Sequence, residues 1–118
     1  MKNCIFCKIA NGDISSEKIF ENDNFFSIFD AAPQIKGHVL VISKKHFKTT
    51  LDMPNSLGPE LLDCIKKTAL RLMEKNNAEG FNIVSNNFEW AGQVVKHVHF
   101  HVLPRKKGDG CCLSLRKK

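Results

Sequence analysis

Long apolar segments are missing from this chain of 118 residues. No apolar run approaches the roughly 20 residues that a membrane-spanning helix requires, so we expect no membrane protein. No apolar stretch of a secretory signal follows the first residues, which predicts a cytoplasmic location. Repeats and low-complexity linkers are absent too, and the length suits one domain over residues 1–118, with a core of about 4–110 and a tail of 111–118.

Acidic side chains are fewer than basic ones, because 12 Asp and Glu against 18 Lys and Arg give a net charge of +6. A basic chain binds nucleic acid when its cations gather in one patch. Here the lysines are scattered in pairs such as Lys44-Lys45 and Lys66-Lys67. We therefore expect no nucleic-acid groove, and a weak field that favours small phosphate-bearing ligands.

Five cysteines without a secretory signal do not predict a disulfide framework. Cys4 and Cys7 form a C-x-x-C motif, which is typical of a redox pair or of half a zinc site. Cys64 lies in a helical pattern and is expected to pack in the core. Cys111 and Cys112 are given no role.

Hydrophobic periodicity predicts one long helix, from Leu57 or Pro59 to about Asn76, with apolar residues at three-and-four spacing. We also expect a short helix over Ile5 to Ala10 and a helical turn within Lys45 to Asp52. Five strands are predicted: Lys18 to Glu21, Asn24 to Asp30, Gly37 to Ser43, Gly80 to Asn86, and Val94 to Leu103, the last ended by Pro104. Short connections favour a five-stranded antiparallel sheet with helices on one face, an α+β fold.

Three histidines, His97, His99 and His101, alternate with apolar residues in the last predicted strand. Successive side chains of a strand point to opposite faces, so the three imidazoles would share one face and the apolar set could bury against the long helix. Such a row suits metal ligation or nucleophilic attack on phosphorus through a phosphohistidine-type intermediate. No Asp/Glu-rich metal cluster lies nearby in the sequence, which favours the second chemistry.

The stretch from Gly92 to Leu103 resembles the signature of the histidine triad (HIT) family. The resemblance extends through Gly37 to His46 and back to Cys4 to Ile9, in the family's order and spacing. It is closest to the nucleotide-binding branch, small homodimeric purine nucleoside phosphoramidases. It therefore implies a hydrolase that cleaves the P–N bond of purine nucleoside 5′-phosphoramidates, with a purine nucleotide as ligand and a second copy of the chain as partner.

The resemblance also implies a role for each matching residue. His99 would attack the α-phosphorus, His101 would contact phosphate and help to protonate the leaving amine, and His38 would complete the cluster. Asp30 would bind the ribose hydroxyls, and the remaining nucleotide contacts would come from Phe6, Ile9, Ile28, Asn86 and Gln93. Without the resemblance, the apolar residues read as core, and Asp30 and Asn86 as turn or loop residues.

A structural zinc ion follows from the same resemblance. Family members that carry C-x-x-C bind the metal with a histidine at the position of His46 and with the first histidine of the triad, here His97. Cys4, Cys7, His46 and His97 would form a closed tetrahedral set that ties the first helix to the histidine segment. The alternative is a pair of unligated thiols in a reducing compartment.

Two positions depart from the family pattern. Val94 stands where phosphoramidases commonly have Ser, so a hydroxyl donor to the phosphate or leaving group is lost. Ser43 stands where Pro is usual, which we expect to affect strand termination alone. Two rival functions remain open: dinucleoside polyphosphate hydrolysis by the same nucleophile, and nucleotide sensing or scaffolding with slow turnover.

Overall fold

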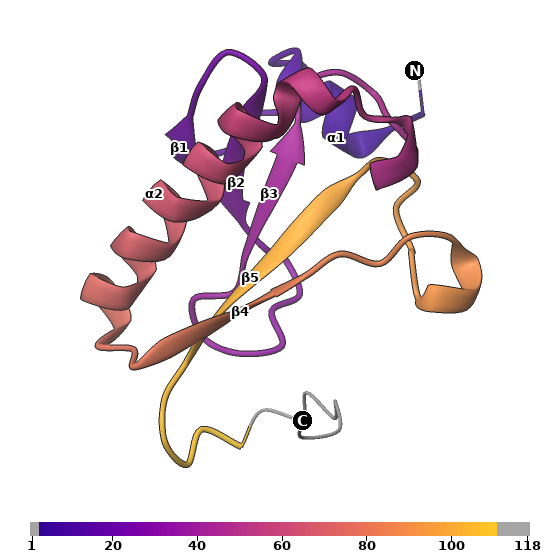
Figure 1. Ribbon diagram of the computed structural model, residues 1–118. Coiled ribbons are helices and arrows are strands. Elements are labelled where there is room, and N and C mark those ends of the chain that lie inside the picture. Colours follow the sequence, from indigo (N-terminus) through magenta and orange to yellow (C-terminus); the bar gives the residue numbers. More distant parts are fainter. Residues whose placement is uncertain (1–2, 111–118) are drawn as a thin grey trace.

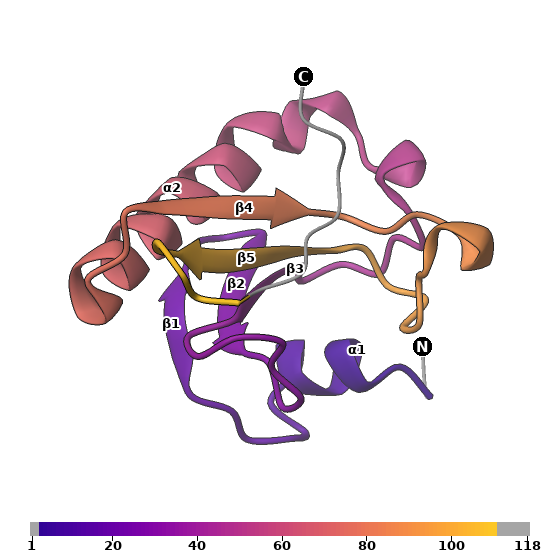
Figure 2. The same cartoon turned by 90° about the horizontal axis from the view of Figure 1, so that it is seen from below.

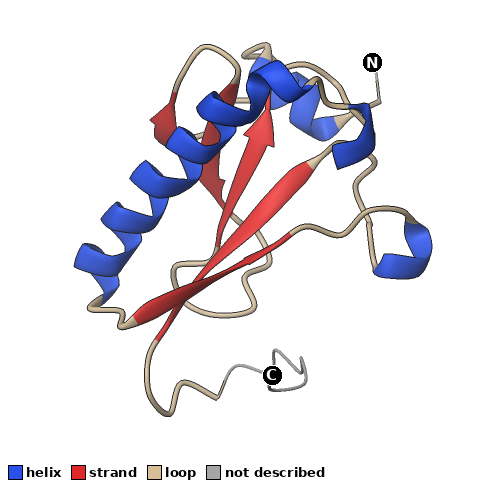
Figure 3. Cartoon of the chain, viewed as in Figure 1, coloured by secondary structure: helices blue, strands red, loops and turns tan. Residues whose placement is uncertain are grey.

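A computed structural model describes residues 3–110 and contains a five-stranded antiparallel sheet (Figures 1 and 3). The sheet order is β1-β2-β3-β5-β4. The strands are β1 Lys18–Glu21, β2 Phe25–Phe29, β3 Val39–Ser43, β4 Gly80–Val84 and β5 His99–Arg105. The predicted α+β class and antiparallel topology are confirmed. The tail of residues 111–118, with Cys111 and Cys112, lies outside the described residues.

The long helix α2 (Gly58–Asn76) crosses one face of the sheet (Figure 1). Pro59 suits its first turn, and Asn77 ends it in the left-handed conformation with φ of 55°. Alternate residues of the central strands face the helix and form one buried cluster: Phe25, Val39, Val41, Cys64, Ile65, Ala69, Leu72, Val98, Phe100 and Val102. The predicted core role of Cys64 is confirmed.

The short helix α1 (Ile5–Ala10) covers the opposite face, which corrects the prediction of helices on one face (Figure 2). Its buried residues Phe6 and Ile9 pack against the other alternate set of strand residues, Phe26, Ile28, Leu40 and Ile42. Both faces of β2 and β3 are apolar, so each face needs its own cover. The sequence pattern alone did not distinguish the two faces.

The last strand differs from its prediction at both ends. It begins at His99 rather than Val94, because the preceding segment leaves the ladder and the Val98 N–H bonds to the Phe47 carbonyl instead, at 2.7 Å. It continues through Pro104 to Arg105. β3 pairs with β5 only as far as Val102, so beyond that residue β5 is paired with β4 alone. Pro104 is tolerated there because its missing N–H would have no partner on the side that β3 has left.

The remaining segments are short. The helical turn expected within 45–52 is confined to η1 (Thr50–Asp52), followed by η2 (Asn55–Leu57), and η3 (Glu89–Ala91) lies between β4 and β5. Among residues 3–110, no helix has the length and apolarity needed to cross a bilayer.

Candidate active site and metal centre

Two histidines of β5 lie on the sheet face that α1 covers. His99 is paired with Ile42 and His101 with Leu40, both members of the cluster that packs on α1. The ring of Phe6 meets the His99 ring edge-on, with centroids 5.1 Å apart. His97 precedes the strand, yet its ring also meets Phe6, at 5.7 Å. The predicted shared face of the three imidazoles is therefore present although only two of them belong to the strand.

His99 is held in one tautomer by the main chain. Its Nδ1 atom lies 2.7 Å from the carbonyl oxygen of His97. A carbonyl only accepts hydrogen bonds, so Nδ1 carries the proton and donates it. The lone pair of a neutral His99 is then on Nε2, the nitrogen a nucleophile needs.

His38 and His101 form a second tautomer chain. The Gln34 N–H donates to His38 Nδ1 at 3.1 Å, so the proton of a neutral His38 is on Nε2. His38 Nε2 lies 2.9 Å from His101 Nδ1 and donates to it. His101 is left with its proton on Nε2, where it can donate a hydrogen bond to a ligand. Asp30 closes the cluster, with a carboxylate oxygen 3.5 Å from His38 Nε2.

Burial favours the neutral form of His101 and of His38. It lowers the pKa of His101 to about 4, with further lowering by His99 and His38 and an opposing effect of Asp30. Burial also lowers the pKa of His38, against the raising effect of Asp30. Neutral rings at pH 7 agree with the tautomer chain, because a doubly protonated His38 could not accept the Gln34 N–H.

A cavity of about 590 Å³ opens beside these histidines. His99 and His101 line it together with most of the predicted nucleotide-binding residues: Phe6, Ile9, Ile28, Asp30 and Asn86. His38 lies just behind, buried, and reaches the cavity through His101. The volume falls in the range typical of sites for small organic ligands.

Gln93 is not among the residues that line this cavity. Its side-chain amide is used within the chain: the oxygen accepts the Phe88 N–H at 2.8 Å, and the nitrogen donates to the carbonyls of Lys48 and Val95 at 2.6 and 3.1 Å. These bonds fix the loop that carries Asn86 and Gly92 at the cavity rim. Gln93 is thus placed to shape the loop.

The sequence reasoning missed several residues of the cavity wall: Ile5, Ile14, Ser15, Ser16, Phe29, Ala31, Ala32, Gln34, Leu40, Gly92 and Val95. Ile14 followed by two serines, just after a helix, was a usable signal, because an apolar side chain in a polar loop needs a partner. Gln34 gave no signal in the sequence, because it contacts His38 through its main-chain N–H, which every residue except proline has.

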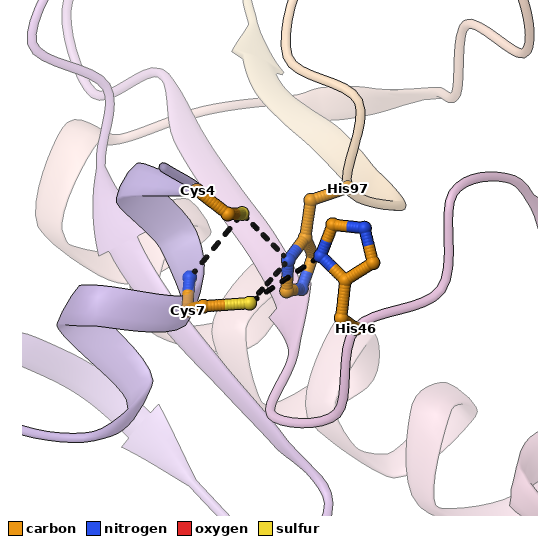
Figure 4. Close-up of side chains that lie close together, drawn as sticks. All are labelled: Cys4, Cys7, His46 and His97. Atoms are coloured by element: carbon orange, nitrogen blue, oxygen red, sulfur yellow. Dashed lines mark hydrogen bonds between the residues drawn. The ribbon is translucent and has the colours of Figure 1, made fainter. Parts of the chain in front are cut away.

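The four predicted zinc ligands lie together (Figure 4). Their ligand atoms are all within 4.8 Å of one another. Cys4 Sγ lies 3.2 Å from His97 Nδ1, and Cys7 Sγ lies 3.3 Å from His46 Nδ1 and 3.5 Å from His97 Nδ1. Zn–S and Zn–N bonds of about 2.3 and 2.0 Å at tetrahedral angles separate S from N by about 3.5 Å. The donor set and its spacing therefore fit one tetrahedral zinc ion.

Ser43 orients His97 for that site. His97 Nε2 donates to the Ser43 carbonyl at 2.7 Å and lies 3.2 Å from its hydroxyl oxygen. The hydroxyl donates in turn to the Lys45 carbonyl at 2.7 Å. The lone pair of His97 is thereby left on Nδ1, which faces the two sulfur atoms. The Ser43 hydroxyl oxygen beside His97 Nε2 is a contact that a proline would lack, in addition to any effect of this residue on strand termination.

Comparison with known proteins agrees with this geometry. The HIT domain model matches residues 11–108. An uncharacterized HIT-like protein of Methanocaldococcus jannaschii is 43% identical over 107 residues, which cover 91% of this chain and 82% of that protein. The adenosine 5′-monophosphoramidase of Candida albicans is 40% identical over 108 residues, which cover 88% of this chain and 71% of the relative.

Solved structures share the fold as well. A Zn-bound histidine triad family protein from Mycobacterium smegmatis superimposes with a TM-score of 0.87 at 35% identity, over 95% of this chain and 81% of that one. Its bound zinc is a property of that protein.

Proposed function

This chain belongs to the HIT domain family, and we propose that it hydrolyses the P–N bond of purine nucleoside 5′-phosphoramidates. The observation that carries the proposal is the orientation of His99. Its Nδ1–H is engaged by the main chain, and its unprotonated Nε2 belongs to a side chain that lines the cavity. An imidazole held in this way is a nucleophile without any need for a separate base.

The reaction proceeds in two displacements at phosphorus. His99 Nε2 forms a bond to the α-phosphorus as the P–N bond breaks, and the departing nitrogen takes a proton from water while the Nε2–H of His101 donates a hydrogen bond to the reacting phosphate and keeps its proton. Water then attacks the nucleotidyl-histidine, the N–P bond breaks, and the proton of that water passes to solvent, which restores the proton taken in the first step. His38 fixes the tautomer of His101 throughout.

The nucleotide lies against the α1 side of the cavity in this proposal. Phe6, Ile9 and Ile28 offer an apolar wall of the kind a purine ring requires. The Asp30 carboxylate accepts the ribose hydroxyls, and one of its oxygens is already held by the Ala32 N–H at 3.0 Å. Asn86, next to Gly92, faces the phosphate.

Zinc has a structural role in the proposal. Cys4, Cys7, His46 and His97 hold the ion, which joins α1 to the segment that carries His99. Four protein ligands leave no open coordination position for substrate or water, so the metal would stabilise the fold and take no part in the reaction. Zinc-bound thiolates suit a cytoplasmic protein.

The functional unit in this proposal is a homodimer. β4 is an edge strand, and its exposed residues Phe81 and Ile83 lie on the α2 face, since Ile83 is paired with Val102 of the α2-facing core. Leu62 of α2 is exposed as well, at 57%. Lys67 reaches Phe20 of β1, and Leu62, which lies about 140° around the helix from Lys67, leans toward β4 on the other flank. An apolar patch along an unpaired edge favours a second copy.

Purified protein assayed side by side on adenosine 5′-phosphoramidate and diadenosine polyphosphates tests the proposed function. We expect AMP release from the phosphoramidate to dominate. Faster cleavage of the polyphosphate would make the P–O bond the true target. Binding of AMP without turnover of either compound would indicate a nucleotide sensor.

A further inference from the structure

A second cavity, of about 510 Å³, adjoins the nucleotide cavity. It is lined by Asn3, Cys4, Ile5, His46, Val94, Val95 and Lys96. Three of these residues, Ile5, Val94 and Val95, also line the nucleotide cavity, so the two spaces share a wall. We propose that this second cavity is the leaving-group subsite. It takes an amine with an apolar chain, and the far end of that chain is uncharged or carries a carboxylate. The inference rests on the proposed function and adds the class of substrate.

The position of the cavity follows from the direction of attack. In displacements at phosphorus the attacking and leaving atoms lie roughly in line. The nucleoside occupies the end of the first cavity at Phe6, Ile9 and Asp30, and His99 attacks from the sheet. The amine nitrogen must therefore leave on the side of phosphorus opposite His99, away from the sheet. Val94, 88% exposed at the rim, stands where the two cavities meet.

The side chains of the shared wall select apolar groups. Val94, Ile5 and Val95 offer branched aliphatic surface and no hydrogen-bond donor from their side chains. Ile5 is 48% exposed, so much of this aliphatic surface is in contact with water. An alkyl or aryl amine covers it and gains free energy in proportion to the apolar area removed from water. Ammonia as leaving group covers none of it.

The charge of one residue that lines the cavity limits the amine further. Lys96 is exposed there, and the residues lining the cavity include no carboxylate. Within residues 3–110, Lys96 makes no ion pair with a carboxylate. Its ammonium attracts a carboxylate on the leaving group and repels a second cation, by an effect that salt screens.

A matched series of adenosine 5′-phosphoramidates tests the subsite. The amines are ammonia, n-pentylamine, 5-aminopentanoate and 1,5-diaminopentane, which differ only in the chain and its terminal charge. For the wild-type protein we expect kcat/KM for pentylamine to exceed that for ammonia at least tenfold. We also expect the aminopentanoate compound to exceed the diaminopentane compound by a similar factor at low salt.

Variants assign those ratios to residues. Val94→Ser should lower the pentylamine-to-ammonia ratio about fivefold or more, and Lys96→Met should abolish the preference for the carboxylate over the cation. Leu51→Ser is the control, because Leu51 is 81% exposed and lines neither cavity; both ratios should stay as in the wild type. Using ratios within each protein removes any general change in catalysis.

Each other result overturns the inference in a recognisable way. If the protein cleaves every compound but Val94→Ser and Lys96→Met leave the ratios unchanged, the proposed subsite is wrong. The phosphoramidase proposal would still hold in that case. Failure of the wild type to cleave any compound of the series would remove both.

Discussion

The Nδ1 atom of His99 donates a hydrogen bond of 2.7 Å to the main-chain oxygen of His97. His97 at the same time turns its own Nδ1 toward Cys4 and Cys7. One residue therefore connects the proposed nucleophile to the proposed metal centre, through its backbone on one side and its imidazole on the other. The order of the metal centre should consequently govern how well His99 is positioned, while the chemistry stays on His99.

Replacement of the nucleophile should remove turnover. We expect His99→Ala to lower kcat by roughly three or more orders of magnitude, because loss of a covalent nucleophile leaves only binding and orientation. Far-ultraviolet circular dichroism and thermal unfolding should show a folded protein. Retention of more than a few per cent of the wild-type rate on adenosine 5′-phosphoramidate would refute the assignment.

Loss of a zinc ligand should affect stability more than chemistry. Protein purified without chelator should contain about one zinc ion per chain, and Cys7→Ser should lower both metal content and melting temperature, because metal that binds only the native state stabilises it by mass action. Cys64→Ala removes a buried thiol outside the cluster and should keep the zinc. Wild-type protein with far less than one ion per chain would contradict the structural zinc. Activity that follows zinc occupancy while the fold persists would make the metal catalytic.

Acid should destabilise the protein through His101. Its pKa of about 4 in the folded chain is below the ordinary value of 6.5, so between these two values the unfolded chain binds a proton that the folded one does not. Stability is therefore fully present above pH 6.5 and is lost as pH falls toward 4, by up to about 3 kcal/mol from this group. Urea unfolding of wild type and His101→Gln at pH 7 and pH 4.5 measures it. The variant should lose less stability on acidification, and equal losses would exclude His101 as the source.

The edge strand should form the dimer contact. We expect sedimentation equilibrium to give twice the mass of one chain, and Ile83→Glu to give monomers, because two carboxylates would be buried at the contact. Leu51→Glu changes an equally apolar exposed residue elsewhere and should stay dimeric. A wild-type monomer at micromolar concentration would contradict the dimer.

The loop that Gln93 fixes stores backbone strain at Phe88. Its φ of 72° and ψ of 159° lie in a region that almost only glycine adopts. Phe88→Gly should stabilise the fold by about 1 kcal/mol. This is the backbone strain that glycine relieves, minus the larger conformational entropy that glycine loses on folding. Phe88→Ala keeps a Cβ atom and should give no such gain. Chemical denaturation compares the three proteins, and a glycine variant less stable than the alanine variant would show that the ring contacts near Lys48 outweigh the strain.

The chain's local patterns determined its elements and the chemistry of its histidines. The helix at Gly58–Asn76 was predictable because its apolar residues recur at three-and-four spacing. The strand at Lys18–Glu21 was predictable from the tight turn at Asn22-Asp23 that follows it. The alternation of His99 and His101 with Phe100 and Val102 likewise predicted one polar and one apolar face.

Only the tertiary structure decided what depends on contacts between distant segments. That α1 covers the second face of the sheet, that Ser43 braces His97, and that Gln34 sets the tautomers of His38 and His101 are all relations across the fold. The end of β5 beyond Pro104 was decided by where β3 stops, not by the proline. Local sequence fixes dihedral preference and amphipathic period, whereas the partner of each hydrogen-bonding group depends on which chain segment the packed core brings beside it.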